Sequence, residues 1–356
     1  MEKTYELMPN AKMLLSSLRS VGYTEETAIA DIVDNSISSG ANTIQLYFDW
    51  DDQTILIADN GKGMQKKELL DSMKIGSSDP GVTRSASDLG RFGMGMKTAS
   101  FSLGKQLLVI SKQKDEINNA EWNLEYVENE DKWEILIHSD EKIDTYIKSK
   151  TDKIEFQNWD EGTLISLSML DKLIDENNMQ KSKVKFYKTV EKVKKHLAMI
   201  FHRFIEEDNL QIYVNKNLLE AWNPFIRQNP ATMELACEEL FDGKTIVSIE
   251  PYILPHKTKF EDEEAFKKAG GAKDWLAHQG FYVYRNRRLI VYGTWFGKFK
   301  KEPAYNLARI KLDMSSESDF EWGIDIKKIK SNITGIYRRK RNTNCIFGNR
   351  KISSSI

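Results

Sequence analysis

Two glycine-rich polar segments, residues 59–64 and 90–97, interrupt the first hundred residues of the chain. The first, DNGKGM, directly follows the strand-like run TILIA at 54–58, and the second, GRFGMGMK, ends an irregular polar stretch that begins at Gly76. Glycine allows positive φ angles and lets a backbone approach a ligand without a Cβ clash. The sequence therefore predicts short helices and strands whose connecting loops surround a bound molecule.

The bulk composition is that of a globular protein with two domains. A length of 356 residues is large for one hydrophobic core. The net charge of −1 gives no sign of a polyanionic partner. Cys237 and Cys345 lack metal-ligand spacing, which favours a reducing compartment and no zinc site or disulfide framework. No apolar run approaches about 18 residues and no signal peptide is visible, so we expect a cytoplasmic protein without membrane contact.

The first half predicts a helix followed by short strands. Residues 24–38 have an apolar helical stripe, with Thr24 as N-cap and two glutamates in the first turn. The runs at 43–48 and 54–58 are separated by an acidic turn and predict a hairpin. Further strands are expected at 107–111, 122–127, 133–138 and 163–169.

The second half predicts a mixed helical and strand domain. A helix opens it, with Val190, Val193, Leu197 and Phe201 at helical spacing. β-type runs follow at 210–214, 245–254, 281–293 and 307–314. A polar, asparagine-rich segment near Asp175 is the expected boundary. The expected domains are therefore 1–175, 176–335 and a basic tail at 336–356.

Asp31 and Asn35 are four residues apart in the predicted helix and so project from one face. A carboxylate there is able to polarise an attacking water, and an asparagine carbonyl suits magnesium, which prefers oxygen ligands. The same pair also fits an ordinary solvated helix face.

The two glycine-rich segments suit the two ends of a nucleotide. An ionised Asp59 only accepts hydrogen bonds, as the exocyclic amine of adenine requires, although DNGKG also fits a simple polar turn. The glycines before Lys97 suit a loop whose N–H groups face phosphates at a helix N-terminus. This loop is not a Walker loop, because the GxxxxGK[ST] pattern is absent.

The order and spacing of these segments resemble the Bergerat ATP-binding fold of the GHKL superfamily. The matching segments are DIVDNSISSGA (31–41), ADNGKGM (58–64), GRFGMGMKTAS (90–100) and EGTLISL (161–167). Within the superfamily the sequence is most similar to the Microrchidia (MORC) branch and its prokaryotic relatives, and also resembles mismatch-repair ATPases. The resemblance covers residues 20–170. It implies an α+β protein: a Bergerat-fold α/β sandwich followed by a transducer-like α/β domain.

The resemblance also implies roles for individual residues. Asn35 would bind magnesium, Asp59 would bind the adenine of ATP, and Thr163 would support Asp59 through a water. Arg91 to Lys97 would surround the phosphates, and Gly76–Ser78 would belong to a lid. The other expected nucleotide contacts are Gly61, Gly63, Met64, Ser77, Phe92, Gly93, Met94, Gly95 and Met96.

Asp31 departs from the family pattern, which usually has a glutamate as the general base at this position. The shorter side chain places the carboxylate farther from its target, and a misplacement of about 1 Å can cost roughly a hundredfold in rate. Slow hydrolysis is the expectation. ATP binding without significant hydrolysis, as in a switch or scaffold, is the alternative.

The resemblance also implies that a lysine of the second domain reaches the nucleotide. The resemblance places it in WGIDIKKIKSNI (322–333), where Lys327, Lys328 and Lys330 all qualify, and we choose Lys328. Basic runs at Lys181–Lys195, Arg285–Arg288 and Arg338–Arg341 suit a DNA backbone, although such runs are often only solvated surfaces.

The leading expectation is an ATP-gated homodimer that acts on DNA. A histidine kinase is disfavoured, because the first histidine, His138, follows the nucleotide motifs instead of preceding them. Chaperone and topoisomerase functions are disfavoured because no segment resembles their additional domains.

Overall fold

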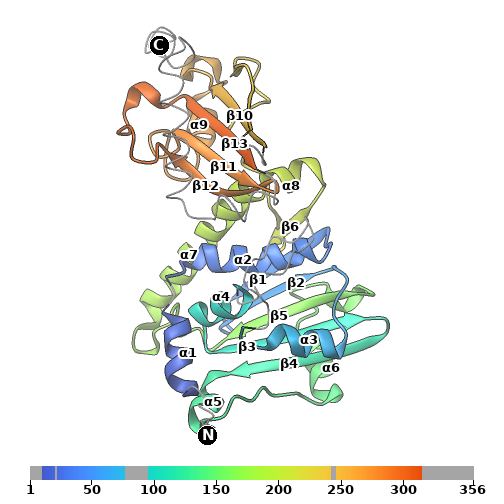
Figure 1. Ribbon diagram of the computed structural model, residues 1–356. Helices are drawn as coiled ribbons and strands as arrows, with labels where there is room; N and C mark the ends of the chain where they lie inside the picture. Colours follow the sequence, from blue (N-terminus) through green and yellow to red (C-terminus); the bar gives the residue numbers. More distant parts are fainter. Residues whose placement is uncertain (1–9, 21, 77–94, 242–245, 315–356) are drawn as a thin grey trace, which may run out of the picture. The chain divides into compact units, whose positions relative to one another are not determined.

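The computed structural model describes residues 10–20, 22–76, 95–241 and 246–314. They divide into two compact units. Unit 1 comprises Met1–Ala198 with Ile205–Glu220, and unit 2 comprises Met199–Phe204 with Ala221–Ile356. Each unit has its own sheet (Figure 1). The expected α+β class is confirmed.

Unit 1 is built on a seven-stranded sheet with the order β4-β3-β5-β2-β1-β6-β7. Its strands are β1 (Thr43–Asp49), β2 (Thr54–Asp59), β3 (Gln106–Gln113), β4 (Glu116–Asn123), β5 (Gly162–Ser168), β6 (Gln211–Val214) and β7 (Asn217–Leu218). Its helices are α1 (Ala11–Arg19), α2 (Glu25–Ser38), α3 (Lys66–Met73), α4 (Gly95–Leu103), α5 (Leu124–Glu130), α6 (Asp140–Lys148) and most of α7 (Met179–Ile200). The pairs β1–β2, β2–β5, β3–β5 and β3–β4 are antiparallel, whereas β6 runs parallel to β1.

The sheet of unit 1 is covered on both faces because its central strands are apolar on both sides. All six residues of β2 are buried. Leu56 and Ala58 pack with Ile143 and Ile147 of α6 on one face. Helices α1, α2 and α4 lie together on the other side of the sheet (Figure 1). Asp59, one residue beyond Ala58, therefore lies on the face that α2 covers.

The helix expected at 24–38 is confirmed as α2. Thr24 accepts a hydrogen bond from the N–H of Thr27 and forms a capping box with it. Glu25 and Glu26 lie in the first turn, where acidic side chains favour the positive end of the helix dipole. The hairpin expected at 43–58 and the strands expected at 107–111 and 163–169 are also confirmed.

Two of the strand predictions for unit 1 are wrong. The run at 122–127 leaves the sheet after Asn123, whose side chain accepts a hydrogen bond from the N–H of Tyr126 and caps α5. The run at 133–138 forms no strand, because its only pairing is an isolated bridge between Glu121 and Leu136. In both places the residues have the composition of a strand, but no partner strand lies beside them over the expected length.

Unit 2 is built on a six-stranded sheet with the path β12-β11-β13-β10-β8, and β9 also pairs with β10. Its strands are β8 (Met233–Glu234), β9 (Glu238–Phe241), β10 (Ile246–Ile253), β11 (Gly280–Arg285), β12 (Arg288–Thr294) and β13 (Ala308–Met314). Helix α8 (His202–Glu207) spans the division between the units, and α9 (Glu263–Ala269) lies in unit 2. The core on one face of the sheet contains Val283, Trp295 and Ile310.

The division between the units falls at different residues from the expected 175. Phe186 of α7 is fully buried in unit 1, with its ring centroid 6.1 Å from that of Phe48 and 5.6 Å from that of Trp50. The strand expected at 210–214 is β6, which extends the sheet of unit 1. Asn215 fixes this edge, since its side chain bonds both the N–H and the carbonyl of Phe48.

We predict that Phe186→Ala lowers the free energy of unfolding of unit 1 by about 3–5 kcal/mol, because it leaves a cavity between α7 and the sheet. Denaturant unfolding followed by tryptophan fluorescence measures this change. Tyr187→Ala is the matched control, since Tyr187 is 48% exposed, and should cost less than about 1 kcal/mol. Equal losses in the two variants would contradict the packing of α7 on unit 1.

Candidate functional site

A row of buried polar side chains crosses three neighbouring strands of unit 1. Asp59 of β2 lies opposite Thr163 of β5, which in turn lies opposite Ser111 of β3. The three residues are 4%, 8% and 0% exposed, respectively. The hydroxyl oxygens of Ser111 and Thr163 are 3.3 Å apart. Polar residues are seldom buried without a structural or functional reason, so this row marks the centre of the candidate site.

The Asp59 carboxylate is held from two sides. Its Oδ2 accepts a hydrogen bond of 2.8 Å from the Ser36 hydroxyl of α2, and its Oδ1 accepts one of 2.9 Å from the N–H of Gly61. Burial raises the pKa of Asp59, and the hydrogen bonds from Gly61, Ser36 and Thr163 oppose that rise. Each carboxylate oxygen can accept more than one hydrogen bond. The fixed carboxylate is thus suited to receive an N–H donor from a ligand.

The loop after β2 requires its glycines. A Cβ on Gly61 would lie 1.9 Å from the Ser39 hydroxyl and 2.9 Å from Oδ1 of Asp59. Gly63 has a φ of +62°, and a Cβ there would lie 2.1 Å from the carbonyl oxygen of Lys112. The next residue, Met64, donates its N–H to the Ser111 hydroxyl at 2.8 Å. The loop is therefore anchored to the same polar row as Asp59.

Asp31 and Asn35 lie one turn apart on α2. Tyr23 donates its hydroxyl to Oδ2 of Asp31 at 2.6 Å, which fixes the carboxylate. Asn35 is exposed, and its Nδ2 donates to the backbone carbonyl of Asp31 at 3.0 Å. No residue in the described part of the chain donates to the amide oxygen of Asn35, so that oxygen is available to a hard cation.

The N-terminus of α4 lies close to Asp31. A Cβ on Gly95 would meet Oδ2 of Asp31 at 3.9 Å. Gly95 and Met96 open α4, where the first N–H groups lack helical acceptors and favour an anion. The packing of α2 against α4 thus brings a carboxylate, an amide and a helix N-terminus to the same side of the sheet.

Lys97 does not point its amine into solvent. Its side chain is 2% exposed, and Nζ donates hydrogen bonds of 2.6 Å to the carbonyl oxygens of both Ser72 and Lys74. Trp122 donates its indole N–H to the carbonyl of Met73 at 2.9 Å. The three carbonyls belong to the last residues of α3 and its C-cap. Lys97 and Trp122 therefore supply donors to helix C-terminal carbonyls that would otherwise lack them. A phosphate contact by Lys97 would have to use its third N–H or exchange one of its two carbonyl acceptors.

Several expected site residues lie outside the described residues. They are Ser77, Arg91, Phe92, Gly93, Met94, Lys328 and the basic run Arg338–Arg341.

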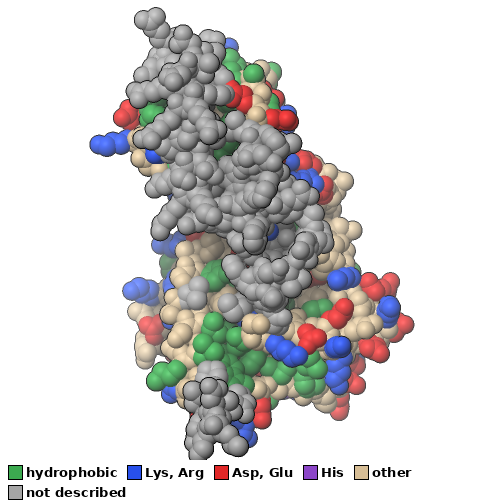
Figure 2. All heavy atoms as spheres, viewed as in Figure 1, with side chains coloured by type: hydrophobic (Ala, Val, Ile, Leu, Met, Phe, Trp, Pro, Cys, Tyr) green, Lys and Arg blue, Asp and Glu red, His purple; other side chains and the backbone are tan. Residues whose placement is uncertain are grey.

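Two of the basic runs are described. On α7 the lysines at 181, 183, 185, 188, 192 and 195 are exposed. The turn at 285–288 differs, because Arg287 and Arg288 lie over the rings of Phe204 and Phe201 at 5.5 and 5.8 Å. Figure 2 shows Lys and Arg side chains interspersed with Asp and Glu on the face in view. The α7 run is therefore the more accessible of the two.

Four site residues were not predicted from the sequence: Tyr23, Ser36, Ser39 and Ser111. A signal existed for Ser36, which follows Asn35 in the predicted helix and so turns away from the exposed Asn35 toward the sheet. Ser111 ends the strand-like run at 107–111, and only the register of β3 with β5 places it beside Thr163.

Among the described residues, no three His, Cys, Asp or Glu side chains gather as a metal site. In the same part of the chain, no helix combines the length and apolarity that crossing a bilayer requires.

Residues 23–160 match the family model described as histidine kinase-, DNA gyrase B-, and HSP90-like ATPase. This range contains Asp31, Asn35, Asp59 and α4. The resemblance to the GHKL superfamily expected from the sequence is confirmed over this segment.

Similarity to individual proteins is confined to part of the chain. ATPase morc-1 of Caenorhabditis elegans is 32% identical over 114 residues, which are 31% of this chain and 13% of that protein. MORC family CW-type zinc finger protein 3 of Mus musculus is 30% identical over 93 residues, 24% of this chain and 10% of that protein. ATPase MORC2B of Mus musculus is 26% identical over 93 residues, which are 25% of this chain and 9% of that protein. The chain thus matches only about a tenth of each relative's length.

The buried amine of Lys97 predicts a pH dependence of stability. Burial lowers the pKa of Lys97 from 10.5 to about 8, so between these values the unfolded chain binds more protons than the folded one. The contribution of Lys97 to the free energy of unfolding therefore rises with pH between about 8 and 10.5. Relative to Lys97→Met, the wild type should gain about 2 kcal/mol in free energy of unfolding from pH 8 to pH 10.

The comparison needs denaturant unfolding at several pH values for both proteins. Lys66→Met on exposed α3 surface is the control and should run parallel to the wild type. A wild-type free energy of unfolding that stays constant or falls relative to that of Lys97→Met between pH 8 and pH 10 would contradict the assignment.

Proposed function

We propose that this chain binds and slowly hydrolyses ATP with magnesium, because residues 23–160 match an ATPase family model and part of the chain is similar to MORC ATPases. The observation that carries the proposal is the buried Asp59 carboxylate, fixed by Ser36 and Gly61 at the end of β2. A rigid buried acceptor selects a ligand amine, because an analogue without the donor would leave the carboxylate unpaired. In this proposal Asp59 accepts the exocyclic amine of adenine, and Thr163 supports it.

The phosphates lie at the N-terminus of α4 in the proposed complex. Gly95 and Met96 supply N–H groups there, and residues 91–94 precede them in the chain. Magnesium usually takes one or two protein oxygens and completes its shell with phosphates and water. In this proposal the amide oxygen of Asn35 is such a ligand, and the cation lies beside Asp31, one turn away on α2.

Asp31 is the proposed general base for the attacking water. Its hydrogen bond from Tyr23 at 2.6 Å holds the carboxylate in one orientation, which compensates in part for the shorter side chain. A well-oriented base is effective only within hydrogen-bond reach of the water. Binding without significant hydrolysis is the second candidate function, and the length of Asp31 is the observation that favours it.

We predict that phosphate release from magnesium ATP is abolished in Asn35→Ala and in Asp31→Asn. Asp31→Asn should still bind ATP, because it removes the base and not a binding contact. Asp59→Asn should weaken ATP binding at least about tenfold, since the amide replaces an acceptor with a donor. Phosphate release and calorimetric titration of ATP with and without magnesium measure these effects.

Asp51→Asn is the matched control for Asp59→Asn, because Asp51 is exposed in the β1–β2 turn. Asp31→Glu separates the two candidate functions. An increase in turnover over the wild type supports slow hydrolysis limited by reach. ATP binding with no turnover in either protein would favour the switch, and no ATP binding by the wild type would refute the site.

We further propose that ATP gates formation of a homodimer and that the α7 lysines contact the DNA backbone. Lysines that neutralise phosphates release counterions, so affinity falls with salt by a slope of about −0.9 per contact. The unit 2 segment, including Lys328, acts in this scheme as a transducer-like domain. The sequence similarity to MORC proteins and the exposed lysines of α7 support this part of the proposal.

We predict that a non-hydrolysable ATP analogue doubles the mass of the particle in light scattering. Lys188→Gln with Lys192→Gln should reduce the salt slope of duplex DNA binding by about 2 in anisotropy titrations. Lys132→Gln with Lys148→Gln is the matched control on other exposed surface of unit 1. A constant monomer mass refutes the gated dimer, and equal slopes in the two double variants refute the role of α7.

A further inference from the structure

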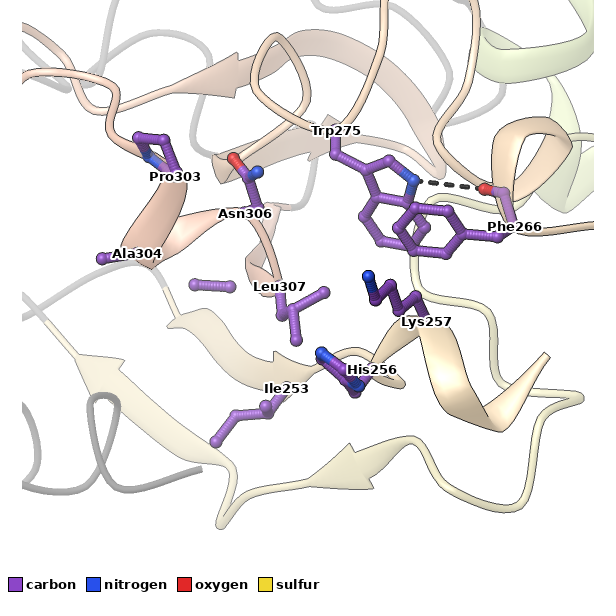
Figure 3. Close-up of a pocket in the computed structure, with 10 residues that line it drawn as sticks. Ile253, His256, Lys257, Phe266, Trp275, Pro303, Ala304, Asn306 and Leu307 are labelled. Atoms are coloured by element: carbon purple, nitrogen blue, oxygen red, sulfur yellow. Dashed lines mark hydrogen bonds between the residues drawn. The ribbon is translucent and has the colours of Figure 1, made fainter. Parts of the chain in front are cut away.

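Unit 2 contains a pocket of about 280 Å³ at the end of β10 and β13, far along the chain from the candidate ATP site. Its volume is near the lower end of the range of about 300–1,000 Å³ for ligand pockets. The ten lining residues are Ile253, His256, Lys257, Phe266, Trp275, Pro303, Ala304, Asn306, Leu307 and Ala308. Figure 3 shows these side chains around the open space.

One wall of the pocket is a rigid aromatic pair. The rings of Phe266 and Trp275 stack with centroids 4.6 Å apart and an interplanar angle of 14°. Trp275 donates its indole N–H to the backbone carbonyl of Phe266 at 3.1 Å, which fixes the Trp275 ring (Figure 3). Ile253, Leu307 and Ala308 add aliphatic surface. The walls therefore favour a flat or branched apolar group.

The charged groups of the pocket are all of one sign. None of the ten lining residues is acidic, and Lys257 supplies an ammonium. Figure 3 shows that ammonium turned toward the space beneath the rings of Phe266 and Trp275. Within the described ranges, no carboxylate forms an ion pair with Lys257. An apolar cavity with an unpaired cation is complementary to a ligand that carries a negative charge.

A second cation lies behind the aromatic wall. The guanidinium of Arg309, a residue only 1% exposed, lies 5.8 Å from the ring centroid of Trp275. Its Nη1 donates to the carbonyls of Asn306 and Ala308 at 2.8 and 3.0 Å. These bonds hold the strand end that forms the pocket floor, and the buried charge adds to the positive potential there.

We propose that this pocket binds a small apolar carboxylate, with its hydrocarbon part against Phe266, Trp275 and Leu307 and its carboxylate on the ammonium of Lys257. The site is separate from the proposed ATP site, since every lining residue belongs to unit 2.

Calorimetric titration of the full chain, without nucleotide, tests this site with 2-naphthoate as the probe. The naphthalene rings match the aromatic wall, and 2-naphthamide is the uncharged probe of the same shape. We expect the carboxylate to bind about threefold to fivefold more tightly than the amide, since the Lys257 side chain is exposed and water screens an ion pair there. Lys257→Met should remove that difference and leave the affinity for the amide unchanged.

Lys259→Met is the matched control, because Lys259 belongs to the same short helix, Lys257–Lys259, but does not line the pocket. It should retain the preference for the carboxylate. Leu307→Trp should abolish binding of both probes, because the larger side chain fills the space. Equal affinity of the wild type for the two probes, an unchanged preference in Lys257→Met, or no binding of 2-naphthoate at millimolar concentration would each overturn the proposal.

Discussion

The fold of the candidate site depends on keeping one carboxylate buried. Asp59 closes β2 at a point where strand residues are inaccessible to water, and burial raises the pKa of its side chain. Desolvating a carboxylate is tolerated only when hydrogen bonds replace the lost water. Ser36 and Gly61 supply them, so α2, β2 and the glycine loop must be positioned together. The nearby Thr163–Ser111 pair extends this constraint across the sheet to the N–H of Met64.

Local sequence signals predicted the parts of the site that depend on local structure. Thr24 and the apolar stripe predicted α2, and the acidic turn between two β-type runs predicted the β1–β2 hairpin. The positions of Asp31 and Asn35 on one helix face follow from helical periodicity alone. Only the order of the motifs associated these segments with a nucleotide. Each motif by itself also fits an ordinary solvated helix face or a polar turn.

Features that depend on distant parts of the chain were not predictable in this way. The amine of Lys97 is held by carbonyls at the end of α3, more than twenty residues earlier, and nothing in the loop sequence indicates that partner. The run at 133–138 has the apolar composition of a strand but has no neighbour to pair with beyond one bridge. Similarly, β6 has the composition of a strand in either unit, and only its parallel pairing with β1 assigns it to unit 1.

The return of the chain to the first sheet after α8 has a consequence for dividing this protein into pieces. Residues 205–220 contribute β6 and β7 to unit 1 after residues 199–204 have already entered unit 2. A fragment ending near residue 175 would keep every motif of the candidate site but would leave β1 as an open edge. Unpaired edge strands associate with one another. A fragment in which β1 keeps its parallel neighbour therefore extends through β6 and β7 to Glu220, well beyond the last nucleotide motif.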